Sequence, residues 1–224
     1  MKSCSGSVKE CDYRQFRLEK LSAPEFRHLW LLLFWPLFGI AFGLLERLPD
    51  AGRFRAVHCA LDDVIPFCEW FLIPYLFWFV YLTGAVAYTL FFDVSVFRRL
   101  MRFIIFTYTV TLVIYILFPS CQELRPIIFE RDNMLTRLTA LFYRFDTNTN
   151  VCPSIHVIGS FAAMFAFLRT RRLRRPLLRV LNVVIALLIC LSTVFMKQHS
   201  ALDVLAALPL CAAGYILFFS GSAR

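Results

Sequence analysis

Long uncharged apolar runs alternate with short charged connections along this chain. The runs lie near residues 29–45, 70–92, 103–121, 151–168, 180–196 and 201–219. A helix needs about 20 apolar residues to cross the hydrocarbon core of a bilayer. The fourth run reaches that length only if it includes the polar turn that begins near Val151. The pattern therefore predicts an all-α, polytopic membrane protein with six transmembrane helices.

The composition indicates lipid as the solvent. Hydrophobic residues make up 59% of the 224 residues, charged residues only 17%, and phenylalanine occurs 25 times. A soluble domain of this size needs more polar surface. We expect residues 1–28 to form a cytoplasmic segment and residues 29–219 to form one membrane domain. The first run, which begins at Leu29, is expected to act as a signal anchor rather than a cleavable signal peptide.

The distribution of the 24 Lys and Arg residues predicts an orientation. Two thirds of them lie before the first run, between the second and third, between the fourth and fifth, and at the last residue. Cytoplasmic connections carry such an excess. We therefore expect a multi-pass protein of the plasma membrane with both termini in the cytoplasm. The net charge of +9 follows from these connections, and no nucleic-acid partner is expected.

The eight cysteines show no metal-ligand spacing such as Cys-x-x-Cys. Cys190 and Cys211 lie inside apolar runs, where we expect them to be packed. Cys121 and Cys152 flank one loop, and they could form a disulfide bond if that loop faces an oxidising compartment. The cysteine pattern therefore predicts no metal site.

A first polar cluster, with the sequence Cys-Pro-Ser-Ile-His, occupies residues 152–156 at the start of the fourth run. Pro153 suits the start of a helix, and Ser154 is expected to be its N-cap. The N–H groups of a helix N-terminus favour an anion, and His156 could donate a proton to a leaving oxygen there. The alternative is an interfacial histidine without a catalytic task.

A second polar cluster, Lys-Gln-His-Ser-Ala-Leu-Asp, occupies residues 197–203 between the fifth and sixth runs. His199 and Asp203 are four residues apart, so a helix would place them on one face. The carboxylate could then bind one ring nitrogen and leave the other free to attack an electrophile. The alternative is a structural hydrogen bond between helices.

The same spacing occurs at His58 and Asp62, between the first and second runs. This pair does not open an apolar span, and we set it aside, although it lies on the same predicted face. Both other histidine motifs open a span from that outer face. Arg125, in the loop between the third and fourth runs, joins them there, and its guanidinium matches phosphate oxygens. These residue types predict a phosphoryl-transfer site without a metal ion, although Arg125 alone could be an ordinary loop charge.

Three segments resemble motifs of the type 2 phosphatidic acid phosphatase superfamily, over roughly residues 103–219. Arg-Pro at 125–126 matches the end of the first motif, Pro-Ser-Ile-His at 153–156 the second, and His-x-x-x-Asp at 199–203 the third. The superfamily also includes haloperoxidases and inositol phosphorylceramide synthase-like phosphotransferases. The resemblance implies a six-helix membrane core with an extracytoplasmic active site.

The chain departs from these motifs at three positions. Phe118 stands where the first motif has lysine, Thr193 where the third has arginine, and Ile155 where the second has glycine. Lys197, two residues before His199, is our candidate for the missing cation. The pattern is more similar to the divergent, inositol phosphorylceramide synthase-like branch than to typical lipid phosphatases.

The resemblance also implies roles. His199 would form a phosphohistidine, Asp203 would orient it, and His156 would protonate the leaving group. The residues that would bind the phosphoryl oxygens are Arg125, Ser154 and Lys197. No cofactor is implied.

The expected activity is metal-independent hydrolysis of a lipid phosphate such as phosphatidic acid, phosphatidylglycerol phosphate or polyprenyl diphosphate. An alcohol acceptor such as inositol, in place of water, would make the protein a phosphotransferase. The expected partners are this substrate and the membrane lipids. Two other classes stay open, a transporter and a non-catalytic scaffold. A transporter would need more charge within the spans than Asp203 supplies and also an internal repeat.

Overall fold

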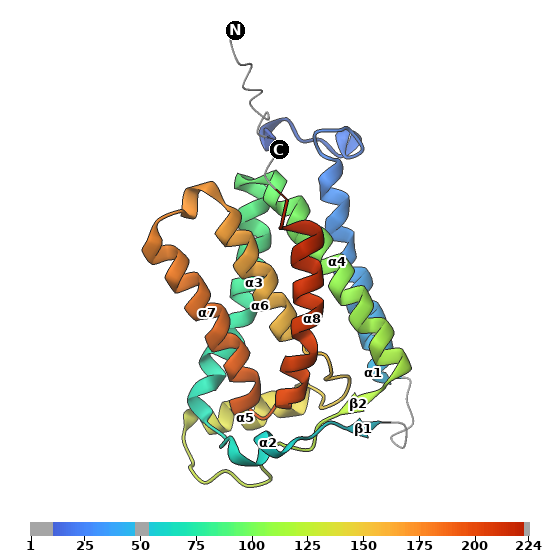
Figure 1. Cartoon of the computed structure of the whole chain (residues 1–224). Helices are drawn as coiled ribbons and strands as arrows, with labels where there is room; N and C mark the ends of the chain where they lie inside the picture. The colour runs from blue at the N-terminus through green and yellow to red at the C-terminus, as the bar shows by residue number, and fades with distance from the viewer. Residues whose placement is uncertain (1–10, 48–53, 222–224) are drawn as a thin grey trace.

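The computed structural model describes residues 11–47 and 54–221. Its long helices are α1 (Phe34–Arg47), α3 (Leu72–Phe92), α4 (Val94–Leu117), α6 (Ile155–Arg169), α7 (Pro176–Phe195) and α8 (Ala201–Phe218). They lie side by side and alternate in direction, so α6 and α8 begin at the same end of the bundle (Figure 1). The predictions for residues 1–10 concern a segment outside the described residues. The same holds for Arg53 and Arg224, two of the basic residues that were used to predict the orientation.

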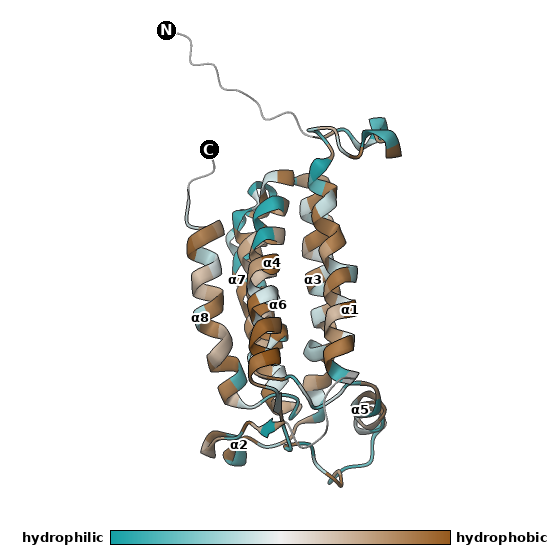
Figure 2. Cartoon of the chain, turned by 90° about the vertical axis from the view of Figure 1, so that its right-hand side faces the viewer, coloured by the Kyte–Doolittle hydropathy of each residue, from teal (hydrophilic) through white to brown (hydrophobic). Residues whose placement is uncertain are grey.

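Five helical segments of the described chain are long and apolar enough to cross a membrane. They are Arg27–Glu46, Glu69–Phe92, Val94–Leu117, Pro176–Phe195 and Ala201–Phe218. Hydrophobic residues cover most of their length, as Figure 2 shows. The fourth predicted span, near residues 151–168, is α6, which has only 15 residues. At about 1.5 Å per residue it is shorter than a hydrocarbon core of about 30 Å. The chain is thus a helical membrane protein with five candidate spans and one shorter apolar helix.

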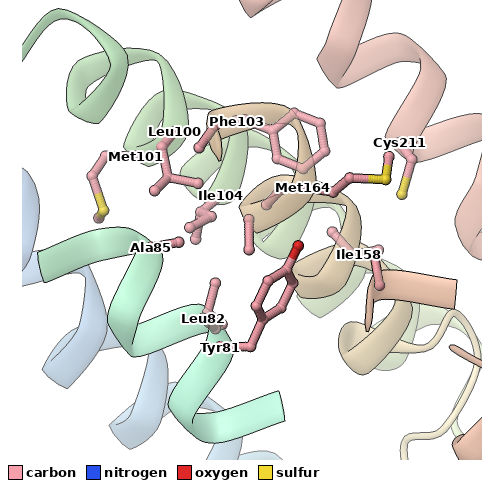
Figure 3. Packing of buried hydrophobic residues seen from close by; sticks show 14 of the residues in the cluster. Tyr81, Leu82, Ala85, Leu100, Met101, Phe103, Ile104, Ile158, Met164 and Cys211 are labelled. Atoms are coloured by element: carbon pink, nitrogen blue, oxygen red, sulfur yellow. The ribbon is translucent and has the colours of Figure 1, made fainter. Parts of the chain in front are cut away.

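The short α6 lies in the centre of the bundle, in contact with α3, α4, α7 and α8. Figure 3 shows Ile158 and Met164 of α6 packed among side chains of the neighbouring helices. Gly159 permits the close approach, because a Cβ atom there would lie 2.9 Å from the indole of Trp78. Protein atoms therefore surround α6 and fix its position relative to the other helices.

The start of α4 differs from the prediction. Asp93, directly after α3, accepts a hydrogen bond from an N–H group in the first turn of α4, so the helix begins at Val94. The prediction treated Arg98, Arg99 and Arg102 as loop residues, and that was wrong: all three lie within α4. Because Asp93 directly follows α3 and also caps α4, it is the single residue that connects the two helices.

Several small elements close the end of the bundle where α6 and α8 begin (Figures 1 and 2). They are α2 (Ala60–Val64), α5 (Met134–Phe145), and the parallel strands β1 (Arg55–Ala56) and β2 (Ser120–Cys121). None of them was predicted, and the two strands make the fold nearly all-α. Short 3-10 helices complete the described elements: Tyr13–Gln15, Leu18–Lys20, Arg27–Leu33, Glu69–Phe71 and Arg171–Leu173.

The two cysteines that flank the predicted loop, Cys121 and Cys152, are both free. The disulfide bond that the sequence left open is therefore not part of this structure. Cys190 and Cys211 are buried, as expected for cysteines inside apolar runs.

Candidate active site

His156 lies in the first turn of α6, at the end of the bundle that the small elements close. Ser154 is the N-cap of this helix, as predicted, and its Oγ accepts a hydrogen bond from the N–H of Val157 at 3.4 Å. The imidazole of His156 is 9% exposed and lies against two aromatic rings of α3. Its centroid is 4.6 Å from that of Tyr75 and 4.4 Å from that of Trp78. The second predicted span thus forms one wall of the site, a role that no residue pattern in that span predicted.

His199 lies in the turn between α7 and α8 and is 6% exposed. Its Nδ1 is 3.1 Å from Oδ2 of Asp203, the contact that the spacing predicted. The reason given for it was wrong, because His199 precedes the helix and does not share a face with Asp203. The N-cap is Ser200, and Asp203 accepts a hydrogen bond from the N–H of Ser200 at 3.0 Å. A capping box therefore brings the carboxylate back toward the histidine.

The two histidine rings lie next to each other in an edge-to-face arrangement, with ring centroids 5.7 Å apart. The N–H of Ser154 donates to the carbonyl oxygen of Asp203 at 3.2 Å, which joins the N-termini of α6 and α8 directly. Within the described chain, neither ring nitrogen of His156 has a hydrogen-bond partner. The ring of His199 binds Asp203 through Nδ1, so Nε2 is the nitrogen available for chemistry.

Arg125 lies next to this pair, held by protein acceptors. Its Nε and Nη2 both donate to Oε1 of Gln198, at 2.9 and 2.5 Å. Its remaining donors bind backbone carbonyl oxygens of residues 143, 146 and 147. The guanidinium also stacks on the ring of Tyr143 at 4.6 Å. Arg125 thus joins the loop after α5 to the residue that precedes His199, and its planar fork holds an amide oxygen.

Asp146, at the end of α5, is an acidic residue of the site that sequence reasoning missed. Its Oδ2 accepts hydrogen bonds from Nε2 of Gln198 at 2.9 Å and from the hydroxyl of Tyr75 at 3.3 Å. Burial raises the pKa of this carboxyl group, and the positive charge of Arg125 opposes that rise. One network therefore runs from Arg125 through Gln198 and Asp146 to the ring that stacks on His156.

Lys197 adopts a left-handed backbone conformation, with φ of 52°. Its Nζ donates to the backbone carbonyl oxygen of Asp62 at 2.6 Å. Burial lowers the pKa of the amine, opposed by the charges of Asp62 and Asp63. The described contact leads away from the two histidines toward α2, so the role of Lys197 as a phosphate ligand stays a prediction.

The pair His58 and Asp62, set aside on sequence grounds, is not a pair in the structure. His58 Nε2 lies 2.8 Å from the carboxylate of Asp63 on the exposed surface. Asp62 points inward and binds Ser200 and Ala201, beside the histidine motif of α8. Asp62 was set aside together with His58, but the structure places its side chain next to the turn that carries His199. The short helix α2 directs the neighbouring acids Asp62 and Asp63 in different directions.

The comparison with protein families agrees with this arrangement. The family model of the PAP2 superfamily matches residues 99–223, which is more than half of the chain. The chain belongs to the PAP2 superfamily. Members of this superfamily are generally phosphatases or phosphotransferases, and the family suggests activity of that type on lipids. No curated protein and no solved structure matches the chain significantly.

The PAP2 match includes every residue proposed for chemistry, from Arg125 to Asp203. In the part of the chain that the structure describes, no group of three or more His, Cys, Asp and Glu side chains could hold a metal ion. The candidate site consists of the two histidines, Asp203 and the hydrogen-bond network of Arg125, Gln198 and Asp146.

Proposed function

We propose that this PAP2 protein is a membrane phosphatase that transfers the phosphoryl group of a lipid phosphate to His199 and then to water, without a metal ion. The observation that carries the proposal is the pair of adjacent imidazoles, with ring centroids 5.7 Å apart, of which one is bound to Asp203 through Nδ1. A ring held in this way presents Nε2 as a nucleophile, and the second ring is a proton donor within reach.

In the first step, Nε2 of His199 attacks phosphorus and forms a P–N bond while the P–O bond to the lipid breaks. His156 gives its proton to the departing oxygen, so the lipid leaves as a neutral alcohol. The imidazole of His199 becomes positively charged, and the carboxylate of Asp203, which is fully buried, stabilises that charge at 3.1 Å. The lipid product and a phosphohistidine remain.

In the second step, His156 removes a proton from water, and the resulting oxygen attacks the phosphohistidine. The P–N bond breaks, inorganic phosphate leaves, and His199 returns to its starting form. An alcohol in place of water would give a phosphotransferase, and that is the alternative activity. The resemblance of the motifs to the inositol phosphorylceramide synthase-like branch favours testing inositol as this acceptor.

Arg125 and Ser154 are the proposed ligands of the phosphoryl oxygens. Nε and Nη2 of Arg125 both donate to Oε1 of Gln198, and the same two donors are the pair that binds two oxygens of a phosphate in a bidentate arrangement. An incoming phosphate would replace that amide oxygen. The hydroxyl of Ser154 accepts from the N–H of Val157, so its own proton is available to a phosphate oxygen. Lys197 is the third proposed ligand.

The change Arg125→Lys is expected to raise KM for a lipid phosphate about 10- to 100-fold, because an ammonium group cannot reproduce the fork. Steady-state kinetics in detergent micelles measures the effect. Arg131→Lys is the matched control, since Arg131 lies in the same connection and its side chain is 71% exposed. Equal KM values for the two variants would contradict a phosphate-binding role of Arg125.

An apolar groove supports a lipid as the substrate. It has a volume of about 500 Å³ and lies between the start of α3 and the second half of α7. Its lining includes Trp70, Phe77 and Leu188. The same part of α3 carries Tyr75 and Trp78, which contact His156. A hydrocarbon chain in the groove would therefore lie beside the proposed reaction site, with its phosphate near the two histidines.

The change Leu188→Trp fills this groove with a larger ring. We expect KM for a long-chain lipid phosphate to rise about tenfold, while turnover of a short, water-soluble phosphomonoester stays unchanged. Val180→Trp is the control, because Val180 is also an exposed residue of α7 but does not line the groove. If Leu188→Trp impaired the reaction of the long-chain lipid phosphate and of the short phosphomonoester to a similar degree, the groove would not be the binding site of the lipid chain.

The activity itself is tested with the purified protein and a panel of lipid phosphates, by measuring phosphate release with and without EDTA. Release that survives EDTA supports the proposal, whereas strict dependence on a divalent cation would overturn it. Absence of phosphate release and of transfer to inositol would favour a non-catalytic scaffold.

For the location of the protein, we propose the plasma membrane, with both termini in the cytoplasm. Labelling of a cysteine placed between α4 and α6 only from outside would support this orientation.

A further inference from the structure

Asp62 makes an unusual set of contacts for a residue of an outer connection. It is 2% exposed, and it lies in α2, far in sequence from the histidine motifs. Its Oδ1 accepts a hydrogen bond from the N–H of Ala201 at 2.8 Å, and its Oδ2 accepts one from Oγ of Ser200 at 2.5 Å. Its backbone carbonyl oxygen accepts from Nζ of Lys197 at 2.6 Å. Three residues around His199 are thus bound to a single residue.

The carboxylate of Asp62 has a second function within α2, where it accepts a hydrogen bond from the N–H of Cys59 at 2.9 Å. Burial alone would raise the pKa of Asp62, but the hydrogen bonds from Ser200, Ala201 and Cys59 together lower it below its ordinary value. A negative charge at the N-terminus of α8 is also favoured by the helix dipole. The charged form is therefore the one that this position stabilises.

The two carboxylates around the start of α8 act on different parts of the histidine motif. Asp203 binds the ring of His199 and the N–H of Ser200, whereas Asp62 binds the hydroxyl of Ser200 and the next N–H along the chain. Removal of Asp62 would leave the donors of Ser200 and Ala201 without their acceptor, in a segment with a left-handed residue at Lys197. The turn that carries His199 would then lose its hydrogen bonds to α2, which hold it in position.

We propose that Asp62 is a positioning residue for the nucleophile, which fixes the turn of residues 197–201 so that Nε2 of His199 faces the phosphoryl group. This inference rests on the proposed phosphohistidine chemistry and extends it to the connection between the first two spans. Asp62 touches neither substrate nor ring, so it affects the rate of phosphoryl transfer and not the binding of phosphate.

The test compares Asp62→Asn with Asp63→Asn. Asparagine keeps the volume of the side chain but turns one oxygen into a donor. That donor opposes the N–H of Ala201 if it replaces Oδ1, and the N–H of Cys59 and the hydroxyl of Ser200 if it replaces Oδ2. We expect kcat to fall about 10- to 100-fold for Asp62→Asn, as for loss of a supporting residue in other sites, with KM changed less than about threefold. The neighbouring Asp63 is exposed and binds only His58 among the described contacts, so Asp63→Asn should match the unmodified protein.

The rate of phosphohistidine formation in a single turnover separates positioning from folding. It should fall together with kcat in Asp62→Asn while the thermal midpoint in detergent stays close to that of Asp63→Asn. If Asp62→Asn does not fold, Ser200→Ala removes one of the same contacts from the other side and should lower kcat in the same way. Unchanged kcat in the folded variant would overturn the inference, and so would a rise in KM alone. Failure of the unmodified protein to form phosphohistidine would instead refute the proposed function.

Discussion

His199→Ala is expected to lower phosphate release from a lipid phosphate by about 10⁴-fold or more, because it removes the atom that forms the bond to phosphorus. The measurement is the release of inorganic phosphate by the purified variant under saturating substrate. The loss should appear in kcat and in kcat/KM alike, since a nucleophile acts in the transition state and contributes little to ground-state binding.

His58→Ala provides the matched control for this experiment. His58 has the same spacing to an acid as His199, but it is exposed and bound to Asp63 at the surface. Its replacement should leave turnover unchanged. Substantial activity in His199→Ala would rule out a covalent role for this residue, and a comparable loss in His58→Ala would point to the other histidine motif.

His156→Ala is expected to have the second largest effect. The loss in kcat for an alkyl lipid phosphate should be about 10²- to 10⁴-fold, the usual range for a general acid. A substrate with a good leaving group, such as an aryl phosphate, does not need the proton in the first step. The phosphohistidine should then form at nearly the normal rate in this variant and accumulate, because no base activates water in the second step.

The comparison of leaving groups is therefore the informative part of the His156 experiment. Equal losses with alkyl and aryl substrates, without accumulation, would indicate a structural role in the stack with Tyr75 and Trp78. Replacement by glutamine or phenylalanine would test that role, since phenylalanine keeps the ring contacts but cannot carry a proton.

The sequence was sufficient for the main elements because apolar periodicity and length dominate a membrane helix. It also predicted the contact between His199 and Asp203, which the structure contains at 3.1 Å. The local geometry could not be predicted. A capping box at Ser200, and not a continuous helix, forms that contact, and spacing alone does not distinguish the two.

The contacts between distant segments were beyond sequence reasoning. Asp146, Tyr75 and Asp62 are distant in the chain from the residues of the site that they support, and nothing in their local sequence indicates this. Gln198 was visible inside the motif, but its task as the acceptor of Arg125 depends on how the loop after α5 folds back. Tertiary packing determines these contacts.

The position of α6 explains how a short helix can hold half of the site. A helix of 15 residues exposed to lipid on all sides would be a poor span, but α6 is enclosed by four other helices. Its N-terminus is joined to that of α8 by the hydrogen bond from Ser154 to Asp203. This hydrogen bond holds together the two helix starts beside which the histidines lie, which favours a fixed distance between the proposed nucleophile and proton donor.

The central claim is that the phosphoryl group passes through His199. The most direct measurement mixes the purified protein with a lipid phosphate that carries a radiolabelled phosphoryl group, stops the reaction with alkaline detergent, and maps the label by proteolysis. The account predicts a label that is stable to alkali, lost in acid, located on His199, and increased in His156→Ala with an aryl phosphate. A protein that releases phosphate with no label on His199, or with the label on another residue, would contradict it.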